Sequence, residues 1–273
     1  MSDLIAHPAF QGAVAPFVVA LIVASALGRT RFAWLAILPA YATMVALDSG
    51  FTLIPLTVSR KSWLLALLAP LVGVAADAYR GSSRRIAPEI AIGAALASLW
   101  VYWTLLRNYP GWRAAWVAAG IAIFFAAMVA LSLRLRDDGL RSGASGLALG
   151  VAVGVAGILS ASIGALVAGA ALAVACGALL IVQIALQRTI APGFTGALPI
   201  GMIAALIAVG AQQLAELPWY ALPLLLLVPI AASLPVPRPE SRFARAAVLS
   251  GMALVAAAFP IAAAWHASRA SLP

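Results

Sequence analysis

A few ionisable side chains near the edges of long apolar stretches are the first candidates for chemistry. Glu89 lies a few residues inside the apolar stretch that runs from Ile86 to Leu106. A charged side chain at the centre of a membrane-spanning helix costs ~2.5–3.5 kcal/mol, so an ionisable residue within a span is a candidate functional group. Glu89 is therefore a candidate carboxylate for coupling a proton or a cation. The alternative is a Glu in the first turn of a helix, where the helix dipole stabilises its charge.

Asp48 is a second candidate because of the segment that it opens. Residues 48–61 read DSGFTLIPLTVSRK, which is too apolar for a free loop and is broken by Pro55. Irregular backbone at membrane depth is tolerated only where protein covers it or where it lines a wet cavity. The segment is therefore either a re-entrant element that lines a site or an interfacial segment that lies flat on the bilayer. Asp77 also ends an apolar stretch, and we interpret it with Arg80 as an interfacial ion pair.

Other polar side chains gather at turns that are predicted to face the same side of the membrane. They are Gln212, Gln213, Glu216, Arg107, Asn108, Trp112 and Arg113. Together with Asp48, Arg60 and Lys61 they predict a polar vestibule at the outer face. The alternative is ordinary interfacial composition, because Trp and Arg favour the headgroup region. We take Gln212, Gln213, Glu216 and Arg60, with Glu89 and Asp48, as the candidate residues for substrate binding or ion coupling.

Several kinds of chemistry lack their usual residues. The only histidines are His7 and His266, and the only cysteine is Cys176, so no cluster with metal-ligand spacing exists. No glycine loop of the ATP-binding type is present. Neither histidine lies near a candidate serine nucleophile in the sequence. We therefore expect no metal and no cofactor, and the sequence argues against an enzyme without excluding one.

The composition indicates which elements must position the candidate residues. The chain is 64% hydrophobic and 9% charged, whereas a soluble domain carries roughly 25% charged residues. A helix needs about 20 apolar residues to cross the bilayer, and the continuous apolar runs match that length. The sequence predicts an all-α, polytopic transmembrane helical bundle of about ten spans. The expected spans are 9–27, 32–47, 62–76, 86–106, 112–133, 143–159, 163–186, 196–214, 218–234 and 243–266.

The net charge of +9 lies mainly in short connections between these spans. Such residues set membrane orientation, so we expect the lipid bilayer rather than nucleic acid as the partner. Odd-numbered connections hold most of the Lys and Arg, which predicts that both termini are periplasmic. Arg far outnumbers Lys and Ala is abundant, which indicates a GC-rich bacterial genome and hence a bacterial inner membrane. We expect one integral membrane domain, 1–273, with the charged loop 134–141 separating two halves, 1–141 and 142–273.

Small residues recur every fourth position in two neighbouring spans. They are Gly146, Gly150 and Gly154 in the first and Gly169 and Gly177, with Ala161, Ala165 and Ala173, in the second. Residues four apart share one helix face. Small side chains on that face let two backbones approach closely in lipid. The pattern predicts a tightly packed helical hairpin, and the alternative is a pair of helices that slide during transport.

A short motif suggests a weak internal repeat. The pattern P-x-F-x-G-A occurs at residues 8–13 and again at 192–197, each time before an apolar span. Inverted repeats are common in secondary transporters, which bind substrate at the repeat interface. The match fades within the spans, so chance is the alternative explanation.

Three functions are compatible with these features. The first is a secondary permease or exporter of a small solute, which requires an interior cavity bordered by Glu89 or Asp48. The second is a non-catalytic membrane subunit that packs against other subunits or against copies of itself. The third is a lipid-binding or lipid-modifying protein, which requires a lateral groove lined by Arg84, Arg85 or Arg134.

Overall fold

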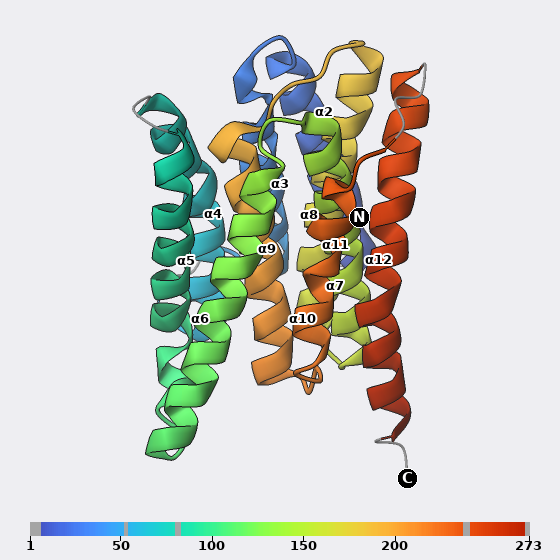
Figure 1. Cartoon of the computed structure of the whole chain (residues 1–273). Helices are drawn as coiled ribbons and strands as arrows, with labels where there is room; N and C mark the ends of the chain where they lie inside the picture. Colours follow the sequence, from blue (N-terminus) through green and yellow to red (C-terminus); the bar gives the residue numbers. More distant parts are fainter. Residues whose placement is uncertain (1–6, 52–53, 80–82, 237–240, 271–273) are drawn as a thin grey trace.

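The computed structural model describes residues 7–51, 54–79, 83–236 and 241–270. Within these ranges all regular secondary structure is helical, and the helices run roughly side by side in one bundle (Figure 1). The prediction of an all-α membrane bundle is therefore confirmed.

Eight helical segments of the described chain are long and apolar enough to cross a membrane. They are η1 with α2 (Phe10–Val14 and Ala15–Leu27), α4 (Val58–Ala78), α5 (Ser83–Leu106), α6 (Gly111–Arg134), α7 (Gly139–Leu159), α8 (Ile163–Ala185), α9 (Gly193–Leu214) and α12 (Arg242–Ala270). Two shorter apolar segments complete the bundle. They are η2 with α3 (Arg31–Ala36 and Ile37–Asp48) and the pair α10 and α11 (Ala221–Leu225 and Leu227–Ser233).

Side-chain caps and prolines account for helix boundaries that differ from the expected spans. α4 begins at Val58, four residues early, because the Thr57 side chain accepts a hydrogen bond from the Arg60 amide. α7 begins at Gly139 because the Asp138 carboxylate accepts hydrogen bonds from the amides of its first turn. α10 ends at Leu225, four residues before Pro229, whose ring nitrogen has no hydrogen to donate to that carbonyl.

The bundle has two ends with different charge. The connections 28–30, 135–138 and 186–192 lie at one end, which we call the arginine-rich end and which is uppermost in Figure 1. The connections 107–110, 160–162 and 215–220 lie at the other end, which we call the opposite end.

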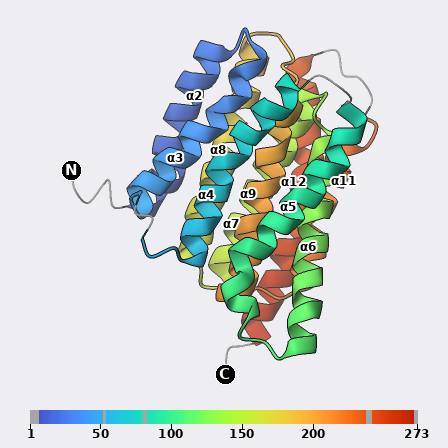
Figure 2. The ribbon, with the colours of Figure 1, turned by 90° about the vertical axis from the view of Figure 1, so that its left-hand side faces the viewer.

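α9 is the central helix of the bundle. In the most apolar 18-residue stretch of α9, 94% of the residues are buried. The same fraction is 22–33% in the peripheral helices α2, α4, α5, α6 and α12. It packs against α4, α6, α7 and α8, and the two views show neighbours on several sides (Figures 1 and 2). A helix that is hydrophobic all round is expected at such a buried position. Any cavity along α9 therefore lies inside protein rather than in lipid.

The helices α7 and α8 form the close-packed hairpin that the small residues predict. A methyl group added to Gly150 would collide with the backbone of Ala173, and one added to Gly169 would lie 2.6 Å from the Gly154 Cα. A methyl group added to Gly146 would likewise collide with the Cys176 sulfur. Gly177 differs, because the nearest atom to an added methyl is a Leu147 side-chain carbon at 3.5 Å.

The two copies of the P-x-F-x-G-A motif occupy unlike places. Residues 8–13 lead into the π-helical turn η1 and then into the peripheral α2. Residues 192–197 begin the central α9, and Gly193 there has φ +59°. The motif therefore does not mark two equivalent positions in the bundle.

The tight seam between α7 and α8 leads to a matched test. We expect Gly150→Ala to lower the apparent Tm of the detergent-solubilised protein, because overpacking costs typically ~1–3 kcal/mol. Gly177→Ala should leave the midpoint within error, since its methyl group has room. Fluorescence-detected size-exclusion chromatography after heating measures the apparent Tm of each variant. Equal midpoints for the two variants would contradict this packing.

Candidate functional site

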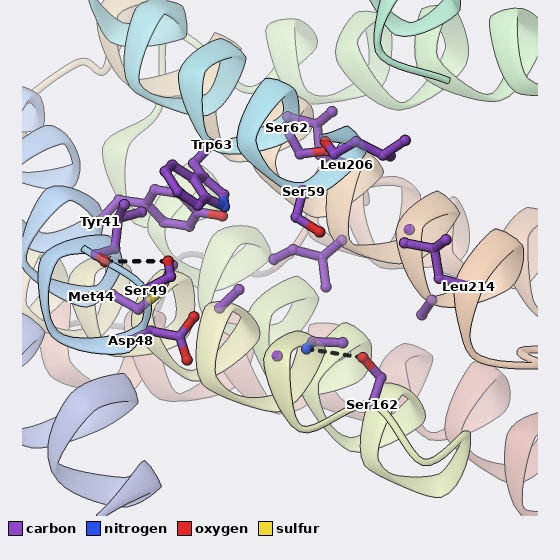
Figure 3. Close-up of a pocket in the computed structure, with 18 residues that line it drawn as sticks. Tyr41, Met44, Asp48, Ser49, Ser59, Ser62, Trp63, Ser162, Leu206 and Leu214 are labelled. Carbon is purple, nitrogen blue, oxygen red and sulfur yellow. Dashed lines mark hydrogen bonds between the residues drawn. The ribbon is translucent and has the colours of Figure 1, made fainter. Parts of the chain in front are cut away.

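A cavity of about 200 Å³ lies between α3, α4, α8 and α9, near the opposite end of the bundle. Figure 3 shows the residues that line it. Its polar lining residues are Tyr41, Asp48, Ser49, Ser59, Ser62 and Ser162. Most of the others are apolar, and they include Met44, Leu206, Ile207 and Leu214.

Each polar lining residue is placed by a helix end or by helical spacing. Asp48 is the last residue of α3, and it is exposed where the cavity opens. Ser59 and Ser62 are three residues apart in the first turns of α4, so they share one face. Ser62 donates a hydrogen bond to the Val58 carbonyl at 2.9 Å. Ser162 caps α8 by accepting the Ala165 amide at 3.3 Å.

Two aromatic rings lie on one side of the cavity. Tyr41 from α3 and Trp63 from α4 lie next to each other above Asp48 in Figure 3. Tyr41 is 5% exposed, whereas Trp63 is half-buried. The faces of Trp and Tyr rings attract cations, and the attraction strengthens where water is excluded.

Asp48 is the only charged side chain among the described residues that line this cavity. The site therefore carries one negative charge, two aromatic rings and several hydroxyl groups. Carboxylate and ring faces favour a cation, and hydroxyl groups can accept or donate hydrogen bonds. This arrangement can bind a small positively charged solute.

The other candidate residues lie elsewhere. Glu89 is exposed on α5 and does not border the cavity at Asp48. Arg60 donates a hydrogen bond to the Pro55 carbonyl at 2.8 Å, which ties it to the connection before α4. Asp48 is thus the single candidate carboxylate that the structure brings to this cavity.

The residues of the predicted vestibule at the opposite end do not share one hollow. Gln212 and Gln213 border a largely apolar pocket of about 340 Å³ between α6, α9 and α10, where Gln213 accepts a hydrogen bond from Tyr109 at 3.2 Å. Glu216 borders a third hollow beside α12. Lys61 is buried against the Trp100 ring, with its Nζ 5.1 Å from the ring centroid.

The described part of the segment 48–61 is a connection followed by the start of α4. Its apolar side chains Phe51, Ile54 and Leu56 are exposed, with Ile54 at 89%. Exposed apolar side chains beside a membrane bundle fit an interfacial segment. Residues 52 and 53 lie outside the described ranges.

Sequence reasoning missed most of the cavity lining. Ser59 lies in the segment 48–61 that the sequence analysis interprets as irregular, and Ser62, Tyr41 and Trp63 lie in predicted spans without any assigned role. One signal was available, because a Ser-x-x-Ser spacing places two hydroxyl groups on one helix face. Thr57, two residues before Ser59, could have indicated the helix start.

Asp77 makes a contact that the sequence analysis does not predict. Its carboxylate accepts hydrogen bonds from the Phe194 amide, the Thr195 amide and the Thr195 hydroxyl at 2.9, 2.9 and 2.6 Å. Arg80 lies outside the described residues. Asp77 therefore caps the N-terminus of α9 from the end of α4, and it joins two helices that line the cavity.

A second charged cluster joins three helices at the arginine-rich end. Asp138 lies 2.5 Å from Arg245 and 3.3 Å from Arg141. Arg141 also donates hydrogen bonds to the carbonyls of Ala232 and Leu234 at 2.8 and 2.7 Å. These contacts hold α7, α11 and α12 together. Among the described residues no group of three or more His, Cys, Asp or Glu could hold a metal ion.

No family model matches this chain. No curated protein matches it either.

The cap on α9 gives a direct test. We expect Asp77→Ala to destabilise the protein by about 2 kcal/mol, because three hydrogen bonds to a carboxylate at a helix N-terminus are lost. Asp137→Ala is the matched control, since the Asp137 side chain is 90% exposed and its nearest cation, Arg136, is 3.9 Å away. Denaturant unfolding in mild detergent measures the free energy of unfolding of each variant. If the two variants unfold at the same midpoint, Asp77 does not hold α9.

Proposed function

We propose that this chain is a secondary permease or exporter in a bacterial inner membrane, and that it moves a small organic cation. The observation that carries the proposal is the Asp48 carboxylate at a cavity lined by two aromatic rings and four serines. A non-catalytic subunit has no need of a cavity between its own helices that carries a carboxylate and several hydroxyl groups. The charge and the rings favour a cation over an anion or an uncharged sugar.

The contacts around the cavity suggest how access is controlled. Asp48, Ser49 and Ser59 are exposed, so solute enters the cavity from the opposite end. At the arginine-rich end, α4 and α9 are in backbone contact, since a methyl group on Gly73 would lie 2.5 Å from the Phe194 carbonyl oxygen. Asp77 caps α9 at the same place. In this conformation the cavity is open at one end and closed by helix packing at the other.

The orientation follows from the charge of the two ends. Arginine-rich connections stay in the cytoplasm, which places the cavity mouth on the periplasmic side. Transport then requires the contacts between α4 and α9 to open while the mouth at Asp48 closes. Rocking of helices around a fixed site is the usual form of such a change in secondary transporters.

A flux assay in proteoliposomes tests the proposal with tetramethylammonium, a permanent cation that lipid alone excludes. We expect the protein to carry radiolabelled tetramethylammonium and to carry it better than glycerol. Asp48→Asn should lower the flux about tenfold, which corresponds to ~1.4 kcal/mol of lost attraction. Trp63→Leu should lower it by a smaller factor, because one ring face is lost.

Glu89→Gln is the matched control, because it also removes one carboxylate but lies outside the cavity. Its flux should equal that of the unmodified protein. Equal flux for Asp48→Asn and the unmodified protein would remove Asp48 from the mechanism. An absence of flux with every probe would favour a subunit role.

A further inference from the structure

Another hollow lies between the peripheral helices α5 and α6. Its volume is about 620 Å³, and its walls are lined by Ala87, Pro88, Ala91 and Ile92 from α5 and by Ala126, Ala127, Ala130 and Leu133 from α6. Arg134, Arg136 and Asp137 line its end. Figure 1 shows the ribbons of α5 and α6 diverging toward the arginine-rich end. We call this hollow the α5–α6 groove.

The walls of the groove suit a hydrocarbon chain. Every wall side chain is apolar and most are alanine, so two helices that diverge leave an open apolar channel. From Ala126 to Arg134 the α6 helix rises about 12 Å. Half of the hydrocarbon core of a bilayer is roughly 15 Å thick. The groove therefore has the length and polarity of one acyl chain in a single leaflet.

The charged end of the groove suits a phosphate group. Arg134 is exposed, and no hydrogen bond or ion pair joins its side chain to another described residue. Arg136 is held differently, because its guanidinium lies 4.9 Å from the centroid of the Phe194 ring. Asp137 is exposed and only 3.9 Å from the Arg136 Nε, so it offsets one of the two positive charges.

The chain carries two more arginines shortly before the groove. Arg84 and Arg85 belong to the first turn of α5, and Ile86 separates them from Ala87, the first wall residue of the groove. Basic residues between spans at the cytoplasmic surface are a known setting for anionic headgroups.

We propose that the α5–α6 groove binds one anionic phospholipid, with an acyl chain along its alanine walls and the phosphate at the Arg134 guanidinium. This proposal is independent of the cavity at Asp48. A bound lipid would fill the space between the α5 wall and the α6 wall of the groove. Each arginine near an anionic lipid surface contributes about 1 kcal/mol, which is roughly a fivefold change in affinity.

Native mass spectrometry of the detergent-purified chain tests this, with phosphatidylglycerol and phosphatidylcholine of identical acyl chains as probes. We expect one phosphatidylglycerol to bind at least fivefold more tightly than phosphatidylcholine. Arg134→Gln should weaken phosphatidylglycerol binding about fivefold and leave phosphatidylcholine unchanged. Arg29→Gln is the matched control, since Arg29 is exposed at the same end but does not line the groove.

A second pair of variants tests the acyl-chain site. Ala126→Phe should block the groove and weaken both lipids, whereas Ala119→Phe, on an exposed position of α6 outside the groove, should not. Size-exclusion profiles verify that all variants fold. Equal effects of Arg134→Gln and Arg29→Gln would overturn the proposal in favour of diffuse surface attraction. Equal binding of the two lipids, or full binding by Ala126→Phe, would also overturn it.

Discussion

The hydrogen bonds from the first turn of α9 to Asp77 are the interaction on which the rest of the bundle depends. A helix N-terminus leaves its first amides without intrahelical partners, and an unpaired polar group in an apolar setting is costly. α9 is the most buried helix, so water cannot reach these amides as it reaches the ends of peripheral helices. A carboxylate from α4 meets this need and fixes the two helices against each other.

That constraint also explains why the cavity lies where it does. α4 and α9 are in backbone contact at the arginine-rich end, where Gly73 meets the α9 backbone. Toward the opposite end, serines on α4 and Gly210 on α9 leave space that large side chains fill elsewhere. The polar groups there reach water through the exposed mouth at Asp48. Close packing at one end and small polar residues at the other therefore leave a cavity near the opposite end, with Asp48 exposed at its edge.

The sequence predicts the helices well because their signal is local. Length and continuous apolarity are enough to identify ten apolar segments, and the four-residue spacing of glycine predicts the α7–α8 seam. Asp48 is a candidate for a similar reason, since a carboxylate beside an irregular apolar segment is visible in the chain itself. Glycine spacing overstates the need for glycine at Gly154 and Gly177, where the nearest atoms to an added methyl group lie at the ordinary contact distances of 3.4 and 3.5 Å.

Contacts between distant segments have no such signal. Asp77 and Thr195 are 118 residues apart, and nothing near either residue predicts that they meet. Gln212 and Gln213 belong to the last turn of α9, whereas Glu216 lies beyond the end of that helix with φ +53°. The two glutamines border one hollow and Glu216 borders another, a separation that their closeness in the sequence does not reveal.

The most direct test of the account is the accessibility and charge of the cavity mouth, read from a thiol placed at Ser59. Cys176 is fully buried and serves as a silent background. We expect Ser59→Cys in intact membranes to react several-fold faster with a cationic methanethiosulfonate than with an anionic one, because Asp48 attracts cations. Adding Asp48→Asn should remove that preference. A thiol at position 59 that does not react would contradict an open cavity. A preference for the cationic reagent that is the same with and without the Asp48 carboxylate would contradict a negatively charged one.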